Sequence, residues 1–169
     1  MKIREILKYS AAVRKVDCTD EAEKLCDRLQ VDVKRKINEL SLGNRKKVSI
    51  ICAMQHRPKL FVFDEPTSGL DPLMQNVFFE LIQEYVNEGA TCMLSTHVLS
   101  EVRNHCTRVA IMKEGKLVVT DTVDNLLSSR SKRIKMIRDG EKLDYIYKDN
   151  LNNLYKELEG HHIEDIIIE

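Results

Sequence analysis

The first forty residues carry two apolar stripes at helical spacing. They are Ile3-Ile6-Leu7-Val13 and Ala22-Leu25-Cys26-Leu29. Positions three and four apart share one face of a helix, so each stripe predicts an amphipathic helix. A third helix is expected over about residues 44–55, because Leu40-Ser41-Leu42-Gly43 introduces it and Pro58 ends it. Residues 1–57 are therefore predicted to form a small helical unit.

From residue 58 onward, expected strands and helices alternate. Strands are predicted over residues 60–63, 91–95, 108–112 and 117–120, the last two joined by a turn at Glu114-Gly115. Asp71-Pro72 begins a long helix that Gly89 ends, and a second helix is expected around residues 98–102. The run Leu60 to Phe63 is wholly apolar, which is typical of a strand covered on both faces in a parallel sheet. Residues 58–125 are predicted to form half of an α/β sandwich.

The last part of the chain has a different pattern. A short helix over 123–127 and the polar linker 128–131 precede a predicted strand, strand, helix and strand over residues 133–168. We therefore expect residues 126–169 to form a small α+β extension.

Charge and cysteine content exclude several classes of protein. Lys and Arg (27) balance Asp and Glu (27), so no excess of positive charge points to nucleic acid. The five cysteines show no CxxC pair, which favours reduced cysteines over a zinc site or a disulfide framework. The charged N-terminus is not a signal peptide, and no apolar stretch approaches the roughly 20 residues that span a bilayer.

Two adjacent carboxylates, Asp64 and Glu65, follow the expected strand over 60–63. At the carboxyl end of a buried strand, the first could hold a hydrated Mg²⁺ and the second could accept a proton from an attacking water. Two solvated acids at an ordinary strand end would be the simpler interpretation of this pair alone.

Two further segments have both a structural and a functional interpretation. Ser95-Thr96-His97 ends the next strand with a histidine, which is more often a surface or core residue than a catalytic one. Ser41-Leu42-Gly43 lies at a helix start, where free N–H groups and the helix dipole suit a phosphate, although a simple N-cap would look the same.

The order of these segments is more specific than any one of them. Leu40 to Asn44, then Asp64-Glu65-Pro66-Thr67-Ser68-Gly69-Leu70-Asp71-Pro72, then Ser95-Thr96-His97 resembles the nucleotide-binding domain of ATP-binding-cassette (ABC) proteins over residues 1–125. The resemblance is strongest to bacterial multidrug and peptide-antibiotic exporters. It implies an α/β fold: a P-loop NTPase-like ABC ATPase fragment, with a helical subdomain and the C-terminal half of the RecA-like core, followed by the α+β extension.

The resemblance also implies a role for each candidate residue. Asp64 would bind Mg²⁺, Glu65 would polarise the hydrolytic water and His97 would contact the γ-phosphate of ATP. Ser41 and Gly43, with Asn44 beside them, would meet the nucleotide held by a second ABC ATPase domain. Asp71 would lie at the seam between the two domains. Leu42 and Asn44 stand where the family consensus has Gly and Gln, which leaves Ser41 and Gly43 in place.

A phosphate-binding loop is missing from the pattern. Such a loop needs several glycines before Lys-Ser or Lys-Thr, whereas the six glycines here are isolated and Gly115-Lys116 is followed by Leu. By resemblance, Met1 falls just past the Q-loop and residues 163–169 stop where the extension usually continues, so we expect a fragment of a longer ATPase. The loss of sheet strands predicts exposed edges and a sticky or oligomeric protein.

Two functions remain open at this point. The first is the ATP-binding subunit of an ABC transporter, working with a transmembrane permease at the inner face of the cell membrane, but inactive alone. The second is a non-catalytic partner that presents its signature residues to an intact ABC ATPase. A nucleic-acid-binding ABC ATPase of repair or translation is disfavoured by the zero net charge.

Overall fold

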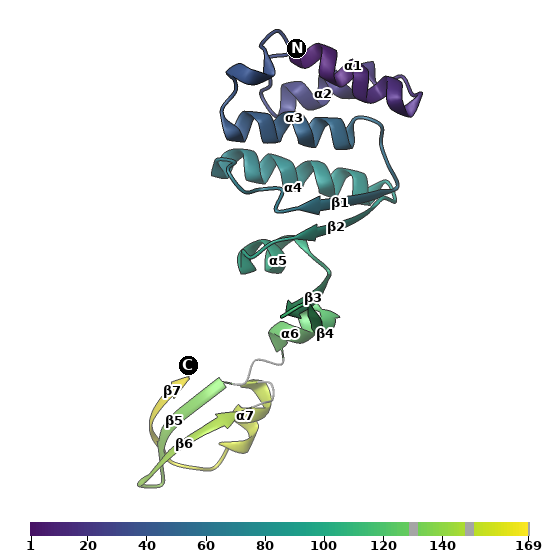
Figure 1. Cartoon of the computed structure of the whole chain (residues 1–169). Coiled ribbons are helices and arrows are strands. Elements are labelled where there is room, and N and C mark those ends of the chain that lie inside the picture. The colour runs from purple at the N-terminus through teal and green to yellow at the C-terminus, as the bar shows by residue number, and fades with distance from the viewer. Residues whose placement is uncertain (129–131, 148–150, 169) are drawn as a thin grey trace. The chain divides into compact units, whose positions relative to one another are not determined.

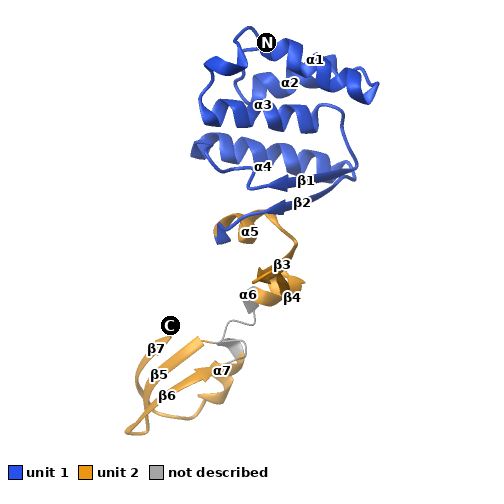
Figure 2. Ribbon diagram, in the orientation of Figure 1, with its two compact units in different colours: residues 1–99 blue, residues 100–169 orange. Residues whose placement is uncertain are grey.

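The computed structural model describes residues 1–128, 132–147 and 151–168. It divides into two compact units, residues 1–99 and 100–169 (Figure 2). Residues 129–131 of the expected linker lie outside the described residues. The predicted domain boundaries at residues 57 and 125 remain predictions.

Along the chain, the first unit contains four α-helices, a 3₁₀ turn and a pair of strands (Figure 1). They are α1 (Ile3–Arg14), α2 (Thr19–Arg28), a 3₁₀ turn (Ile37–Glu39), α3 (Leu42–Met54), β1 (Leu60–Asp64), α4 (Pro72–Asn87) and β2 (Thr91–Ser95). α4 lies between α3 and the strands. Each of the elements expected from the apolar spacing in this part of the chain is confirmed.

The second unit begins within α5 (Leu99–His105) and holds two antiparallel sheets. β3 (Arg108–Lys113) pairs with β4 (Lys116–Thr122), and α6 (Val123–Ser128) follows. β5 (Lys132–Arg138) is flanked by β6 (Glu141–Tyr147) and β7 (Ile163–Ile168), with α7 (Leu151–Glu157) between them in sequence. The predicted strand, strand, helix, strand order is confirmed. The small hydrophobic core between this sheet and α7 contains Ile134, Met136, Tyr147 and Leu154.

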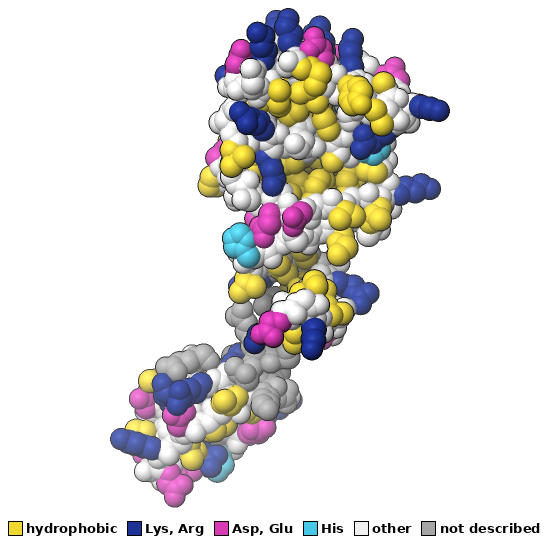
Figure 3. Space-filling model, viewed as in Figure 1, with side chains coloured by type: hydrophobic (Ala, Val, Ile, Leu, Met, Phe, Trp, Pro, Cys, Tyr) yellow, Lys and Arg dark blue, Asp and Glu magenta, His cyan; other side chains and the backbone are white. Residues whose placement is uncertain are grey.

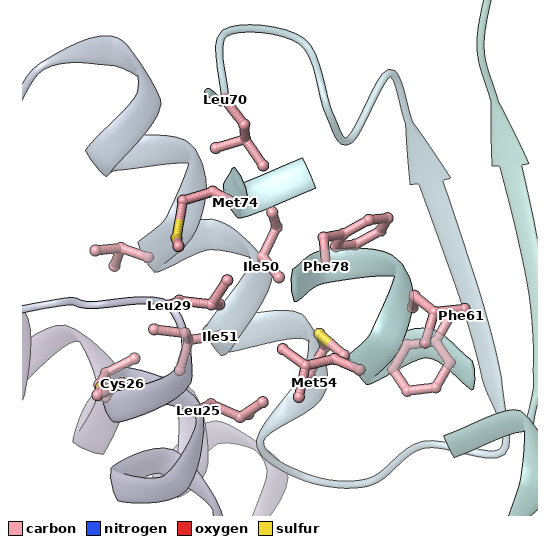
Figure 4. Close-up of a cluster of buried hydrophobic side chains, with 14 of the residues drawn as sticks. Leu25, Cys26, Leu29, Ile50, Ile51, Met54, Phe61, Leu70, Met74 and Phe78 are labelled. Atoms are coloured by element: carbon pink, nitrogen blue, oxygen red, sulfur yellow. The ribbon is translucent and has the colours of Figure 1, made fainter. Parts of the chain in front are cut away.

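One hydrophobic core unites the helices and β1 in the first unit (Figure 4). Ile51 and Met54 of α3 and Phe78 of α4 have no exposed surface. Figure 4 shows side chains of α2, α3, α4 and β1 meeting in this cluster. Fully burying a side chain of this size stabilises the fold by about 1.5–3 kcal/mol. Because Leu40 and Leu70 belong to the same core, it is also the main support for the segments that precede α3 and α4.

The two strands of the first unit are parallel. Leu60 to Asp64 pair in register with Thr91 to Ser95. Phe61 and Phe63 face α4, where their rings contact Tyr85 and Phe78 at centroid distances of 5.3 and 5.4 Å. Because side chains alternate along a strand, Asp64 and its register partner Ser95 point to the opposite face.

Charged side chains also tie α2 and the α3–β1 turn to α4. Arg28 contacts Glu84 at 2.7 Å and Glu80 at 3.1 Å. Arg57, in the turn, pairs with Glu21 at 2.8 Å and lies 5.4 Å from the centre of the Tyr85 ring. Pairs this exposed contribute about 0–1 kcal/mol each, so they orient the helices more than they hold them together.

Candidate functional site

Four polar residues meet at the carboxyl edge of the parallel strands, and we call them the edge cluster: Asp64, Glu65, Ser95 and His97. Asp64 ends β1 and Ser95 ends β2, and the two residues are register partners. Parallel strands bring their carboxyl ends to one edge of the sheet, where α/β proteins bind their ligands. The strand register thus places both residues together although 31 positions separate them in sequence.

Ser95 links the two carboxylate residues. Its Oγ donates a hydrogen bond to Asp64 Oδ1 and accepts one from the Glu65 backbone N–H at 3.1 Å. The same N–H also lies 3.2 Å from the Ser95 carbonyl oxygen. Sequence reasoning selected Ser95 only as part of a motif and missed this role, because the role follows from strand register.

Glu65 adopts an unusual backbone conformation. Its φ is +45°, in the left-handed region that a residue with a side chain seldom occupies and that costs of order 1–3 kcal/mol. Its carboxylate reaches His97, with Oε1 2.9 Å from His97 Nδ1. The His97 side chain is 79% exposed and that of Glu65 is 35% exposed. The turn at Glu65 therefore aims its carboxylate at an imidazole that is open to solvent.

A second group lies where α3 and α4 begin, and we call it the helix-start cluster: Ser41, Gly43, Gly69 and Asp71. Ser41 is the N-cap of α3, and its Oγ accepts the Asn44 N–H at 3.4 Å. Asp71 is the N-cap of α4, and its Oδ1 accepts the Met74 N–H at 3.1 Å. Pro72 follows as the first helical residue of α4. Both caps match the starts that the sequence indicated.

The loop over residues 66–70, which includes Gly69 of the helix-start cluster, joins Glu65 of the edge cluster to Asp71. Glu65 precedes it and Asp71 follows it. Thr67 and Leu70 are buried, and the Gln75 side chain donates hydrogen bonds to the carbonyl oxygens of both. These hydrogen bonds anchor the loop to α4 and thereby restrain the separation of Glu65 and Asp71 at its two ends.

The donor set of the edge cluster fits Mg²⁺ in the manner of a nucleotide site. Among residues 1–128, 132–147 and 151–168, no group of three or more His, Cys, Asp or Glu side chains could enclose a metal ion. Mg²⁺ is usually bound through one or two carboxylates, several waters and substrate phosphates rather than by a protein cage. Asp64, which is exposed and has one carboxylate oxygen bonded to Ser95, suits that arrangement. At such a site the ion would neutralise charge on phosphate oxygens.

The groups that could act on a bound nucleotide are separate from a cavity in the first unit. A cavity of about 530 Å³ lies between α1 and α2 and is lined by residues such as Leu7, Ala11, Ala22 and Cys26. It contains no residue of either cluster. Asp64 and His97 of the edge cluster are themselves exposed, which suits a ligand that a second surface would cover.

Comparisons with known proteins cover the part of the chain that contains both clusters. A family model described as "AAA domain, putative AbiEii toxin, Type IV TA system" matches residues 28–103, a range that contains every candidate site residue. The chain is 29% identical to the uncharacterized ABC transporter ATP-binding protein YhaQ of Bacillus subtilis over 86% of its own length and 51% of that protein. It is 37% identical to the probable multidrug ABC transporter ATP-binding protein YbhF of Escherichia coli over 53% of its length and 15% of that protein.

A solved structure gives the same result. The ATP binding subunit of an ABC transporter superposes with a TM-score of 0.71 at 27% identity, over 75% of this chain and 55% of that chain. The homologues and structural neighbours of this chain are ABC transporter ATP-binding proteins with a P-loop NTPase fold. The resemblance and the fold class expected from the motif order are confirmed.

Two further facts bear on how far the family likeness extends. The chain spans about half the length of YhaQ and of the solved subunit. Within the part of the chain that the structure describes, no helix is both long and apolar enough to cross a membrane.

Proposed function

We propose that this chain is part of an ABC transporter subunit that couples ATP hydrolysis to export across a membrane. The observation that carries the proposal is the geometry of the edge cluster. Glu65, in a left-handed turn, places its Oε1 2.9 Å from His97 Nδ1, and Asp64 lies next to it at the end of β1. YbhF, one of the homologues, is a probable multidrug transporter protein by name, which favours export.

In this proposal the edge cluster acts on the chain's own nucleotide. Asp64 would hold Mg²⁺, and Glu65 would accept the proton of the attacking water. His97 contacts the γ-phosphate and, through its bond to Glu65, keeps that carboxylate in place. These roles need the two carboxylates in different environments, and the exposed Asp64 and half-buried Glu65 satisfy that need.

The helix-start cluster acts on a nucleotide held elsewhere. Ser41, Gly43 and Asn44 meet ATP bound by a second ABC ATPase domain, at the positive end of the α3 helix dipole. Asp71 lies at the seam with that domain. The remaining partner is a transmembrane permease, which places the protein at the cytoplasmic face of the membrane.

The chain alone is proposed to bind ATP weakly and not to hydrolyse it. Phosphoryl transfer depends on positioning the phosphates, and these 169 residues contain no glycine-rich Gly-Lys-Ser or Gly-Lys-Thr loop. The test is a steady-state ATPase assay on the purified chain with Mg²⁺, run beside Glu65→Gln. Turnover that Glu65→Gln abolishes would refute this part of the proposal, and calorimetry showing tight Mg²⁺-dependent capture of ATP would do the same.

A second candidate function is regulation of an intact ABC ATPase. Ser41 and Asp71 are both exposed, so the helix-start cluster could be offered to another cassette without rearrangement. Mixing the chain with an intact ABC ATPase and measuring its turnover separates the two functions. Stimulation that Ser41→Ala removes, and that Ser49→Ala on the exposed side of the same helix leaves intact, would support regulation. No effect of the wild-type chain would support the first proposal.

A further inference from the structure

Gly43 lies unusually close to the loop between the two clusters. A Cβ atom built on Gly43 would stand 2.5 Å from the carbonyl oxygen of Gly69, a separation that real Cβ atoms essentially never show. The atom in the way is backbone, so a side chain at residue 43 could not turn aside to avoid it. Residue 43 is therefore restricted to glycine by the loop, independently of any ligand.

Helical geometry does not explain a glycine at this position. Gly43 is the second residue of α3, its φ is not in the left-handed region, and alanine is a better helix former than glycine. Gly69, in contrast, has a φ of +80°, which favours glycine for its own backbone. The two positions thus require glycine for different reasons: Gly69 adopts a left-handed φ, and Gly43 leaves space for the Gly69 carbonyl oxygen.

We propose that Gly43 is a positioning residue that seats the loop over residues 66–70 and thereby sets Glu65 relative to Asp71. The Ser68 N–H bonds to the Glu65 carbonyl at 3.3 Å, and the Leu70 N–H bonds to the Thr67 carbonyl at 3.0 Å. Displacing the Gly69 carbonyl would strain both hydrogen bonds: the first holds Ser68 to Glu65, and the second holds Leu70, which precedes Asp71. The start of α3, which would meet a partner's nucleotide, is in this way coupled to the glutamate that would act on the chain's own.

The neighbouring residue adds to the contact. Leu42 is 75% exposed, yet its Cδ2 and Cγ lie 3.7 and 3.9 Å from the position that a Cβ on Gly69 would occupy. Its side chain therefore lies beside Gly69, while Gly43 leaves space for the Gly69 carbonyl oxygen. The inference deepens the proposed function and rests on it only for the roles of Glu65 and Asp71.

The test is amide hydrogen exchange, followed by NMR, on the whole chain without nucleotide or partner. We expect Gly43→Ala to speed exchange at Ser68 and Leu70 by roughly ten- to a hundredfold, the usual range for overpacking, with little change at Phe78 in α4. Ser49→Ala, in the same helix and exposed, is the matched control and should change none of these rates. Equal acceleration at every amide, or unchanged rates at Ser68 and Leu70, would overturn the proposal.

A measurement on the wild-type chain covers the case in which Gly43→Ala does not fold. If the contact joins the two segments, the Asn44 and Leu70 amides should open together, with the same dependence on low denaturant concentration. Leu70 opening at clearly lower denaturant than Asn44 would overturn the proposal. Because no nucleotide takes part, neither result depends on whether the chain binds ATP or a second ATPase.

Discussion

The two faces of the β1–β2 sheet differ sharply although the same strands build both. On one face, Phe61 and Phe63 pack against α4, and Phe61 is 2% exposed. On the other face, Leu60, Val62 and Met93 are 58%, 70% and 67% exposed. Figure 3 shows hydrophobic side chains gathered on the surface of the first unit, with acidic side chains next to a histidine.

The difference corrects one expectation from the sequence. The apolar run Leu60 to Phe63 indicated a strand covered on both faces, whereas within the described residues only the α4 face is covered. The parallel pairing that the run also indicated is confirmed. Asp64 and Ser95 share the open face by strand alternation, so the packed face supplies stability and the open face carries the candidate site residues.

The largest expected effect is a difference in stability between substitutions on the two faces of the sheet. Phe61→Ala should lower the free energy of unfolding of the first unit by about 3–5 kcal/mol, because it leaves a cavity against Tyr85 and α4. Val62→Ala, its neighbour on the open face, should change it by less than about 0.5 kcal/mol. Urea unfolding of the two variants measures both values. Similar losses would show that the open face is covered in solution.

The next effect concerns the hydroxyl of Ser95. Ser95→Ala removes the donor to Asp64 and one acceptor for the Glu65 N–H, and should cost about 1 kcal/mol. Ser95→Thr keeps a hydroxyl and should retain most of the stability. Urea unfolding gives the cost, and exchange of the Glu65 amide reports the local change. A Thr variant as impaired as the Ala variant would indicate packing rather than hydrogen bonding.

Replacing exposed apolar side chains on the open face should change association more than stability. The wild-type chain is expected to self-associate through Leu60, Val62 and Met93, because exposed apolar patches of this kind favour contact. Val62→Lys should lower the average mass measured by light scattering, with a stability change within about 0.5 kcal/mol. Tyr9→Lys on α1, also at an exposed position, is the control and should leave association unchanged. A clean wild-type monomer at high concentration would contradict the prediction.

The smallest effect is a pH dependence that arises in the turn between α3 and β1. Burial, and then the charge of Arg14, lower the pKa of His56 below its ordinary value of about 6.5. The unfolded chain then binds the proton more readily, so the stability from neutral His56 is complete above about pH 6.5 and is lost as pH falls toward the folded pKa. His56→Gln should flatten this part of the curve of unfolding free energy against pH. An unchanged slope between about pH 7.5 and 5.5 would count against this assignment.

The sequence predicted the elements well because their signals are local. Helix caps such as Ser41 and Asp71, and breakers such as Pro58 and Gly89, act within a few residues of the structure that they begin or end. The motif order was sufficient to indicate a resemblance to ABC ATP-binding domains, which the comparisons confirm. The roles of Asp64, Glu65 and His97 in catalysis remain predictions, although the structure brings all three to one edge of the sheet.

By itself, the sequence determined which residues are candidates for chemistry and in what order they occur, because residue type and spacing are properties of the chain. Only the tertiary structure decided that Ser95 holds Asp64 and that Gly43 must lack a side chain. Both facts depend on segments about 25 to 30 residues apart meeting within a few ångströms, and only strand register and helix packing set such distances.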